Sequence, residues 1–517
     1  MGIQDFIGLR NDGYGYVDKT ERIYDLITNP AKFIFFSRPR RFGKSLLCSV
    51  LGAIFENKRE LFKGLAIDSS DWEWKQYPII RIDLNSGDFT QGLRILELTL
   101  NNTLKNIADD YGLNLRGEIP SIQFTNLIKD LNRKFQEKVV VIIDEYDKPL
   151  LSTIDNPKLH EEMRNALKGF YGVLKSADEH LKFVFLTGVT KFSKVSIFSD
   201  LNNLTDISLS PQYCDLCGIT QEELEKNFQD NIDEIVKNTS VKKEDYLEKL
   251  KYFYNGYRFS PNPVTVYNPF GLLNHFNDGG EFNSYWYESG TPTFLIKLIK
   301  NQNIDIMDLE KKSVNRNEFR KYDVEKMPAI PVLYQSGYLT ISNYDEEFQE
   351  FTLDYPNEEV RTSFAKSLIS QYLCATENAK NALVTMLPKS LIKGEINSAM
   401  NSLISFLASI PYDIQLKDEK YYQTVVHLIF TMLGFNCRSE VRTASGRIDA
   451  LVETKNNVYC FEFKLDGTAD EALAQIDTKE YLLPWKTSDK NLFKIGVNFD
   501  FEKRNIKEWK VAKDFYS

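Results

Sequence analysis

The residues best suited to chemistry are a lysine and a serine at the end of a short loop. Residues 38–45 read Arg-Pro-Arg-Arg-Phe-Gly-Lys-Ser, between the apolar run Phe33–Phe36 and apolar residues at helical spacing. This order predicts a strand, a tight loop and the start of a helix. In such a loop the backbone N–H groups surround a phosphate, Lys44 reaches the β- and γ-phosphates, and Ser45 offers its hydroxyl to Mg²⁺. The alternative is an ordinary loop that contains Gly-Lys-Ser by chance.

A second motif favours nucleotide binding over that alternative. Val139–Ile143 is an apolar β-branched run that ends in Asp144 and Glu145. Such a run is typical of a strand buried on both faces of a parallel sheet. Two carboxylates at its end are costly without a cation, and a Mg²⁺-nucleotide at the carboxyl edge of the sheet supplies one. We expect Asp144 to hold the metal through water and Ser45, and Glu145 to polarise the attacking water.

Two further strands belong to the predicted nucleotide site. Pro78–Leu84 lies between the two motifs in the sequence, and Lys182–Leu186 ends in Thr187, which we expect to sense the γ-phosphate. Arg38 stands where such a loop usually has its first glycine. The loop and helix residues expected to contact the nucleotide beside Lys44 and Ser45 are Arg38, Arg40, Arg41, Phe42, Gly43 and Leu46.

Another set of candidate residues lies near the C-terminus. The pattern after Glu419 predicts a helix, two strands joined by a turn, a second helix and a last strand. These elements are expected at 422–433, 447–452, 458–464, 469–483 and 492–497.

The two middle strands of that run carry a pair of carboxylates. Residues two apart share a face of a strand, so Glu462 and Lys464 point one way while Phe461 and Phe463 point into the core. Across the hairpin, Asp449 can lie beside Glu462. The two carboxylates repel each other unless a proton or a cation lies between them. With Mg²⁺ or Mn²⁺ they form a site for phosphodiester hydrolysis, in which Lys464 steadies the attacking hydroxide and the charge on the phosphate.

Gln475, on the next helix, is expected to orient this site. The alternative is a hairpin with a surface Glu–Lys pair, because the pattern Asp…Glu-x-Lys is common by chance. The surrounding order of elements and the preceding Gly446-Arg447-Ile448 favour a nuclease-type fold.

The composition places limits on the class of protein. A chain of 517 residues is too long for one core, and 42% apolar with 26% charged residues is ordinary for a soluble globular protein. No apolar run is long enough to span a membrane, and six cysteines without a metal-binding pattern around Cys214 and Cys217 indicate reduced thiols and a cytoplasmic location. With a net charge of −9, any nucleic-acid contact must be a local basic patch. The cluster of Arg38, Arg40 and Arg41 is one candidate, with phosphate binding by the loop as its alternative. The basic tail residues 503–513 are another candidate, although we favour a solvated helix face there.

The middle of the chain offers little chemistry. Thr220 and Glu223 form a predicted capping box at a helix start. Residues 327–353 read as helix, turn, strand, turn and strand, with one strand over 333–341 and the other over 348–353. This order suits a winged helix, but the acidic residues around Asp345 and Glu346 repel phosphate, so a structural or docking role is favoured over DNA binding. Residues 380–410 are expected to form a helical connector.

These motifs resemble a known two-part family of bacteria. The first part resembles the AAA-ATPase-like proteins, in which an arginine replaces the first loop glycine and a Glu follows the metal-binding Asp. The segments of this chain that carry the resemblance are residues 16–20, 38–45, 143–147, 186–189, 254–259 and 285–294. The second part resembles the PD-(D/E)XK nuclease superfamily domain that commonly follows. The segments that carry this second resemblance are residues 446–449, Glu462-x-Lys464 and residues 475–481.

The expected protein is therefore α/β, with an AAA+-like P-loop domain at 1–215, a mostly helical and winged-helix-like region at 216–390, and a restriction-endonuclease-like domain at 391–517. The resemblance implies an ATP- and Mg²⁺-dependent protein coupled to a metal-dependent nuclease fold that acts on DNA or RNA. One alternative is an ATPase switch or scaffold whose nuclease-like domain is inactive and only binds. Another is a signalling module that binds nucleotide without hydrolysing it, against which the intact Glu145 argues. The oligomeric state is not readable from these motifs.

Overall fold

The computed structural model describes the fold of most of the chain. The described residues are 2–191, 203–290, 293–302, 304, 306–315, 328–372, 377–410, 419–433, 436–443, 446–500 and 502–514. The chain folds into two compact units. The first consists of Met1–Gly290 and Lys311–Asn357, and the second of Thr291–Glu310 and Glu358–Ser517. The middle region expected at 216–390 therefore supplies residues to both units, and the three-part division stays a prediction.

A parallel five-stranded sheet forms the centre of the first unit. Its strands are β1 (Phe33–Ser37), β2 (Ile79–Asp83), β3 (Val139–Asp144), β4 (Leu181–Gly188) and β5 (Thr205–Asp206). The order is β2-β3-β4-β1-β5, so β4 lies between the loop-bearing strand and the acidic strand. All residues of β1 and β3 are buried, as their continuous apolar sequence predicts for strands covered on both faces. The four strands expected from the sequence are confirmed.

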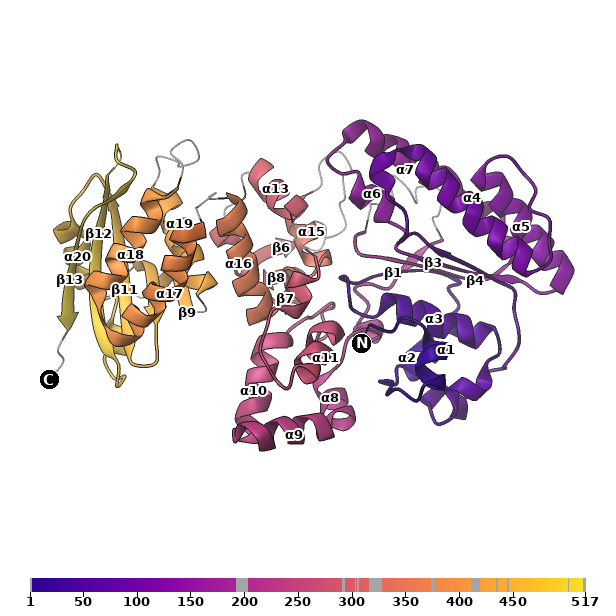
Figure 1. Cartoon of the computed structure of the whole chain (residues 1–517), viewed down its shortest axis with the longest axis horizontal. Coiled ribbons are helices and arrows are strands. Elements are labelled where there is room, and N and C mark those ends of the chain that lie inside the picture. Colours follow the sequence, from indigo (N-terminus) through magenta and orange to yellow (C-terminus); the bar gives the residue numbers. More distant parts are fainter. Residues whose placement is uncertain are drawn as a thin grey trace. The chain divides into compact units, whose positions relative to one another are not determined.

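Helices cover both faces of this sheet (Figure 1). One face carries α1 (Phe6–Asn11), α2 (Thr20–Ile27) and α3 (Lys44–Phe55), and the other carries α4 (Leu93–Asp110), α5 (Pro120–Phe135), α6 (Lys148–Ser152) and α7 (Pro157–Ser176). The sheet is buried between two helical layers, which leaves its carboxyl edge as the place where loops can bind a ligand.

The rest of the first unit is mainly helical. It contains α8 (Gln221–Asn227), α9 (Gln229–Thr239), α10 (Lys243–Tyr254), α11 (Pro269–Asn277), α12 (Tyr285–Glu288) and α15 (Ala329–Gln335). A small antiparallel sheet has the order β6-β8-β7, from β6 (Lys312–Asn315), β7 (Thr340–Asp345) and β8 (Glu350–Asp354). The capping box of Thr220 and Glu223 is confirmed.

Two details of the winged-helix-like stretch differ from expectation. Leu333–Gln335 belongs to α15, and the strand starts only at Thr340. The apolar run 331–334 suits a buried helix as well as a strand, and its periodicity cannot separate the two. Nearly every residue of α15 is buried, so this helix is not available to enter a nucleic-acid groove.

The second unit combines helices with a mixed sheet. Its helices are α13 (Thr293–Asn301), α16 (Glu358–Tyr372), α17 (Glu377–Lys393), α18 (Ile396–Ala408), α19 (Glu419–Met432) and α20 (Ala469–Thr478). The sheet order is β13-β12-β11-β10-β9, from β9 (Asn436–Thr443), β10 (Gly446–Glu453), β11 (Asn457–Leu465), β12 (Asn491–Asp500) and β13 (Asn505–Asp514). Only β11 and β12 are parallel, and α20 connects them. The helical connector expected at 380–410 is confirmed.

The sequence interpretation missed both edge strands of this sheet. The basic tail is not a helix face, because β13 pairs antiparallel with β12 along its length. Lysines at 507, 510 and 513 have helical spacing, but Trp509 and Val511 lie across from Val497 and Ile495 and extend the sheet. In addition, α20 ends at Thr478, so Tyr481 lies beyond the helix.

None of the helices within the described ranges is long and apolar enough to cross a membrane.

Candidate functional sites

The loop between β1 and α3 has the backbone of a phosphate-binding loop. Gly43, the residue before α3, has a φ of 94°, a left-handed conformation that glycine adopts without a steric penalty. Arg41 also has a positive φ of 65°. The loop therefore turns sharply and places the N-terminus of α3, with its free N–H groups, at the carboxyl edge of the sheet.

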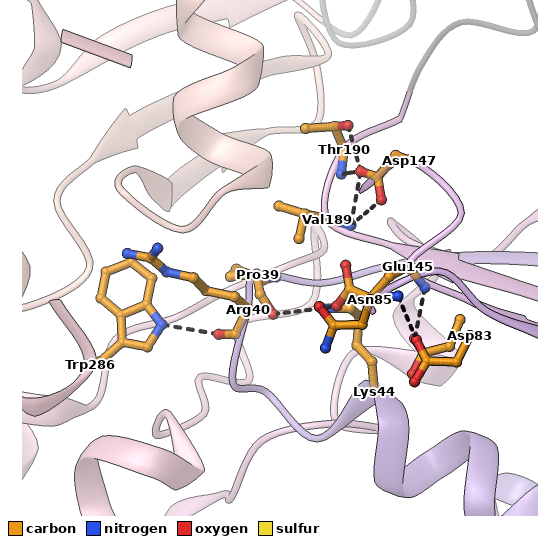
Figure 2. A network of polar contacts seen from close by, with 11 residues as sticks. Pro39, Arg40, Lys44, Asp83, Asn85, Glu145, Asp147, Val189, Thr190 and Trp286 are labelled. Carbon is orange, nitrogen blue, oxygen red and sulfur yellow. Dashed lines mark hydrogen bonds and ion pairs between the residues drawn. The ribbon is translucent and has the colours of Figure 1, made fainter. Parts of the chain in front are cut away.

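Lys44 and Glu145 meet at this edge (Figure 2). The Lys44 Nζ lies 3.2 Å from Glu145 Oε1 and donates to the carbonyl of Pro39 at 3.3 Å. Only 3% of the Lys44 side chain is exposed. Burial lowers the pKa of this lysine, but the carboxylates of Glu145, Asp144 and Asp147 outweigh that effect and raise it overall. Lys44 is therefore held as a cation at the end of the loop.

Asp144 lies in an environment with too little positive charge. It is 1% exposed, and its pKa is raised to about 6, first by burial and then by the neighbouring Glu145. A hydrogen bond with Ser45 and the charge of Lys44 oppose this shift. Asp83, at the end of β2, lies beside Asp144 in the sheet register and adds to the repulsion. Hard oxygen donors gathered around too little positive charge fit a Mg²⁺-nucleotide.

Thr187 occupies the next strand end. It pairs with Phe36 in the register of β4 and β1, is fully buried, and its hydroxyl has no hydrogen-bond partner within the described part of the chain. A buried hydroxyl without a partner is unfavourable, and an added acceptor would satisfy it. The structure thus brings Lys44, Ser45, Asp144, Glu145 and Thr187 to one edge of one sheet, as the sequence predicts.

Arg38 is placed differently from the other loop residues. Its guanidinium is buried and donates to the carbonyls of Ser37, Ser208 and Tyr213, while its backbone N–H donates to Gly188. The group also lies 4.3 Å from the ring of Phe259. Arg38 therefore anchors the start of the loop to the protein, because its two terminal nitrogens, Nη1 and Nη2, donate to protein carbonyls instead of a phosphate. No signal in the sequence indicated this placement.

Arg40 fastens the loop to the helical part of the same unit. Its guanidinium donates to the Gly290 carbonyl and, at 3.1 Å, to the Tyr338 hydroxyl. In return, Trp286 Nε1 donates to the Arg40 carbonyl at 3.0 Å (Figure 2). Gly337 packs on Pro39, where a Cβ would lie 2.8 Å from the proline ring.

The remaining loop residues make further anchors. Arg41 lies over the ring of Phe270 at 5.0 Å, and the buried Phe42 makes edge contacts with Tyr257 and Phe259. Leu46 is half-buried in the first turn of α3. The 254–259 and 285–290 motifs, which showed no chemistry in the sequence, thus support the loop.

Cys214 and Cys217 lie near this loop as buried free thiols. Burial raises the pKa of both, to about 11 for Cys217, which makes them poor nucleophiles.

The second candidate site lies on β10, β11 and α20. The Lys464 Nζ is 3.1 Å from Glu462 Oε1 and donates to Gln475 Oε1 at 2.8 Å. Asp449 Oδ2 accepts a hydrogen bond from the backbone N–H of Phe463 at 2.8 Å, which places this carboxylate across the hairpin beside Glu462. Glu462 is 1% exposed. The four residues predicted from the sequence are thus brought together.

The opposite face of β11 belongs to the core. Phe461 and Phe463 are each 1% exposed, and their rings pack 6.2 Å apart. No metal-binding group of three or more His, Cys, Asp or Glu side chains occurs within the described ranges. The available donor set is therefore the pair Asp449 and Glu462, whose hard carboxylate oxygens suit Mg²⁺ or Mn²⁺.

Two acidic residues near the carboxyl edge of the parallel sheet, Asp83 and Asp147, were not predicted from the sequence. Asp83 could have been found, since it is the next-to-last residue of the predicted strand 78–84, which the structure places beside the acidic strand. Asp147 stands inside the Asp-Glu-Tyr-Asp run, but nothing in the sequence showed that its carboxylate is buried against the end of β4.

The first unit has the parallel sheet and the strand–loop–helix arrangement of an AAA-like α/β fold, and the second has the strand–helix arrangement of a PD-(D/E)XK nuclease fold. Comparisons with known proteins agree. Residues 1–198 match the model of a family described as predicted AAA-ATPase, and residues 417–509 match the PD-(D/E)XK nuclease superfamily. A protein of Azotobacter chroococcum mcd 1, described as an uncharacterized protein in the vnfD 5′ region, is 34% identical over 522 residues, covering 98% of this chain and 97% of the relative. The chain belongs to the family of AAA-ATPase-like proteins that carry a C-terminal PD-(D/E)XK nuclease superfamily domain.

Proposed function

We propose that this protein binds and hydrolyses ATP with Mg²⁺, and that a nuclease domain coupled to it cuts DNA or RNA with Mg²⁺ or Mn²⁺. The observation that supports the ATPase part of this proposal is the buried Lys44, which lies near Asp144 and Glu145 at the end of a loop shaped like a phosphate-binding loop. The second half rests on the cluster of Asp449, Glu462 and Lys464.

The residues of the first site have separate roles in this proposal. Lys44 binds the β- and γ-phosphates as a cation, and the N-terminus of α3 supplies N–H donors. Ser45 and Asp144 hold the metal, which neutralises charge on the phosphates when it is bound. Glu145 orients and deprotonates the attacking water, and Thr187 donates to the γ-phosphate.

In the second site Asp449 and Glu462 hold the metal, which supplies Lewis-acid stabilisation to a phosphodiester when it is bound. Lys464 stabilises negative charge on the scissile phosphate. Gln475 holds the Lys464 amine in place from α20, at 2.8 Å.

The rival function is an ATPase switch whose nuclease-shaped domain only binds. The observation against it is that Lys464 is held by both Glu462 and Gln475, an arrangement that a binding module does not require. A cytoplasmic location, expected from the cysteines, stays a prediction.

One experiment tests both halves. Purified full-length protein is incubated with labelled DNA and RNA, with and without ATP, in Mg²⁺ or Mn²⁺, and phosphate release and cleavage are followed together. Lys44→Ala should lose ATP binding by calorimetry, and Lys464→Ala should lose cleavage while it keeps ATP hydrolysis. Unchanged ATP affinity in Lys44→Ala would refute the first site. If no nucleic acid is cut in any nucleotide state, the binding-only alternative holds.

A further inference from the structure

The segment that follows β4 is tied to the turn that follows β3 by one buried carboxylate. Asp147 Oδ2 accepts from the backbone N–H of Thr190 at 2.6 Å, from its hydroxyl at 2.7 Å and from the backbone N–H of Val189 at 3.1 Å. Figure 2 shows these bonds above the Lys44–Glu145 pair. Asp147 is fully buried.

Contacts of the preceding residue, Tyr146, join the same two strand ends. The Tyr146 N–H donates to the Thr187 carbonyl at 3.1 Å, and the Tyr146 hydroxyl donates to the Thr190 carbonyl at 2.8 Å. Gly188 lies so close that a Cβ there would be 2.3 Å from Asp147 Oδ1. The turn after Glu145 and the segment after Thr187 therefore have little freedom to move relative to each other.

The same segment is also held from its other side. The Lys191 N–H donates to Gln335 Oε1 of α15 at 2.7 Å. Because Val189, Thr190 and Lys191 are each hydrogen-bonded to another part of the unit, a displacement at Asp147 is expected to appear at Thr187 and Glu145.

Maintaining this carboxylate in the core is costly. Burial and the nearby Glu145 raise the pKa of Asp147, and no ion pair within the described ranges includes Asp147. A buried charge without an ion-pair partner is tolerated only when hydrogen bonds satisfy it. Apolar side chains could join two strand ends at lower cost, but they would not fix a distance through directed hydrogen bonds.

We propose that Asp147 is a positioning residue for ATP hydrolysis. By holding Val189 and Thr190 against the turn after β3, it sets Glu145 and Thr187 at the separation that the attacking water and the γ-phosphate require. This inference rests on the proposed ATPase function.

The test compares hydrolysis with nucleotide binding in the full-length protein. The informative variants are Asp147→Asn, which leaves an NH₂ group facing a backbone N–H, Thr190→Val, which removes the hydroxyl donor, and Thr190→Ser, which keeps it. Thr153→Val is the matched control, because it removes a buried hydroxyl that bonds to the Pro149 carbonyl at 2.9 Å in α6.

We expect kcat to fall about 10- to 100-fold in Asp147→Asn and Thr190→Val, since small misplacements of reacting groups have effects of this size. The KM and the calorimetric Kd for ATP should change by less than about threefold, because the direct contacts of Lys44, with Glu145 and the Pro39 carbonyl, do not include Asp147 or Thr190. Thr190→Ser should keep a kcat near that of the wild type. Thr153→Val should also keep a kcat near that of the wild type, although its loss of Tm should be similar to that of Thr190→Val.

Several results would overturn the proposal. One is an unchanged kcat per folded molecule in Asp147→Asn, and another is a Kd that rises by the same factor as kcat falls. If Asp147→Asn does not fold, the two variants at Thr190 provide the test. Equal kcat values in Thr190→Val and Thr190→Ser would refute the positioning role of Asp147. A wild-type protein that binds but does not hydrolyse ATP would refute the proposed function itself, and this inference with it.

Discussion

At the scale of single residues, the proposed nucleotide site is defined by a shortage of positive charge. Lys44 is the cation in direct contact, at 3.2 Å from Glu145, while Asp144 and Asp83 lie on adjacent strand ends. This arrangement stores unfavourable electrostatic energy in the free protein, which a bound metal–nucleotide would relieve. Two predictions follow from this balance.

The first prediction concerns Glu145 as the base that deprotonates the attacking water. Glu145→Gln keeps the size and shape of the side chain but removes the proton acceptor, so ATP turnover should fall about 10²- to 10⁴-fold while ATP stays bound. Steady-state phosphate release and calorimetry measure the two quantities. If turnover is unaffected, another group must act as the base.

The second concerns stability and pH. The pKa of Asp144 rises from 3.8 to about 6 in the folded protein, mainly through burial. The folded state therefore binds the proton more tightly than the unfolded state. Because of this carboxyl, the free energy of unfolding increases as the pH falls from above 6 to about 4, and decreases as the pH rises over the same range. Asp144→Asn should raise the free energy of unfolding at pH 8 by about 1–3 kcal/mol without nucleotide, and change it little at pH 4.

Chemical denaturation at the two pH values checks this, and calorimetry should show that the same variant has lost Mg²⁺-dependent ATP binding. An Asp144→Asn protein less stable than wild type at pH 8 would contradict the assigned cause of the pKa shift.

At the scale of elements, the candidate nuclease site depends on a close approach between a strand and a helix. In the second unit, Gly496 of β12 lies under α20, where a Cβ would be 2.3 Å from the Ala469 carbonyl and 3.0 Å from the Leu473 N–H. These are backbone atoms, so the helix and not a side chain must move. Gln475, on the same helix, positions Lys464.

Gly496→Ala should therefore displace α20 from the sheet and reduce nuclease cleavage by at least about tenfold, since the Lys464–Gln475 contact is lost. ATP hydrolysis should stay unchanged, because it depends on the other unit. Gly172→Ala is the control, since a Cβ there meets nothing within 4 Å. Full cleavage by Gly496→Ala would show that α20 does not position the nuclease site.

At the scale of the whole molecule, two chemical sites lie on one chain with a net charge of −9. Overall repulsion of nucleic acid means that local basic groups or a nucleotide-dependent change must favour binding. The proposal of coupling predicts that ATP changes the affinity for nucleic acid. By linkage, nucleic acid must then change ATP affinity by the same factor, typically about 5- to 150-fold.

A variant with Glu145→Gln and Asp449→Ala should allow both affinities to be measured without turnover. Titration of ATP with and without DNA or RNA, and the reverse titration, should give equal factors. Identical affinities when both ligands are shown to be bound would mean that the two sites act independently.

The features predictable from the sequence are those with short-range causes. Continuous apolar runs predicted β1 and β3, because burial on both faces requires apolar residues at nearly every position. Gly43-Lys44-Ser45 and Glu462-x-Lys464 could be recognised because their spacing follows from local backbone geometry. The alternation of side chains along a strand was enough to assign Phe461 and Phe463 to the core.

Other features depended on residues far apart in the chain. The basic tail adopts a strand and not a helix because β12 provides hydrogen-bond partners and an apolar neighbour for Trp509, which local spacing cannot reveal. Arg38 contacts carbonyls about 170 positions away, and Arg40 contacts Gly290 and Tyr338, so their roles as anchors arise only when the chain folds. Burial of Asp147 against Val189 and Thr190 has the same origin: hydrogen bonds between distant segments form only after the packing of the sheet has brought the strand ends together.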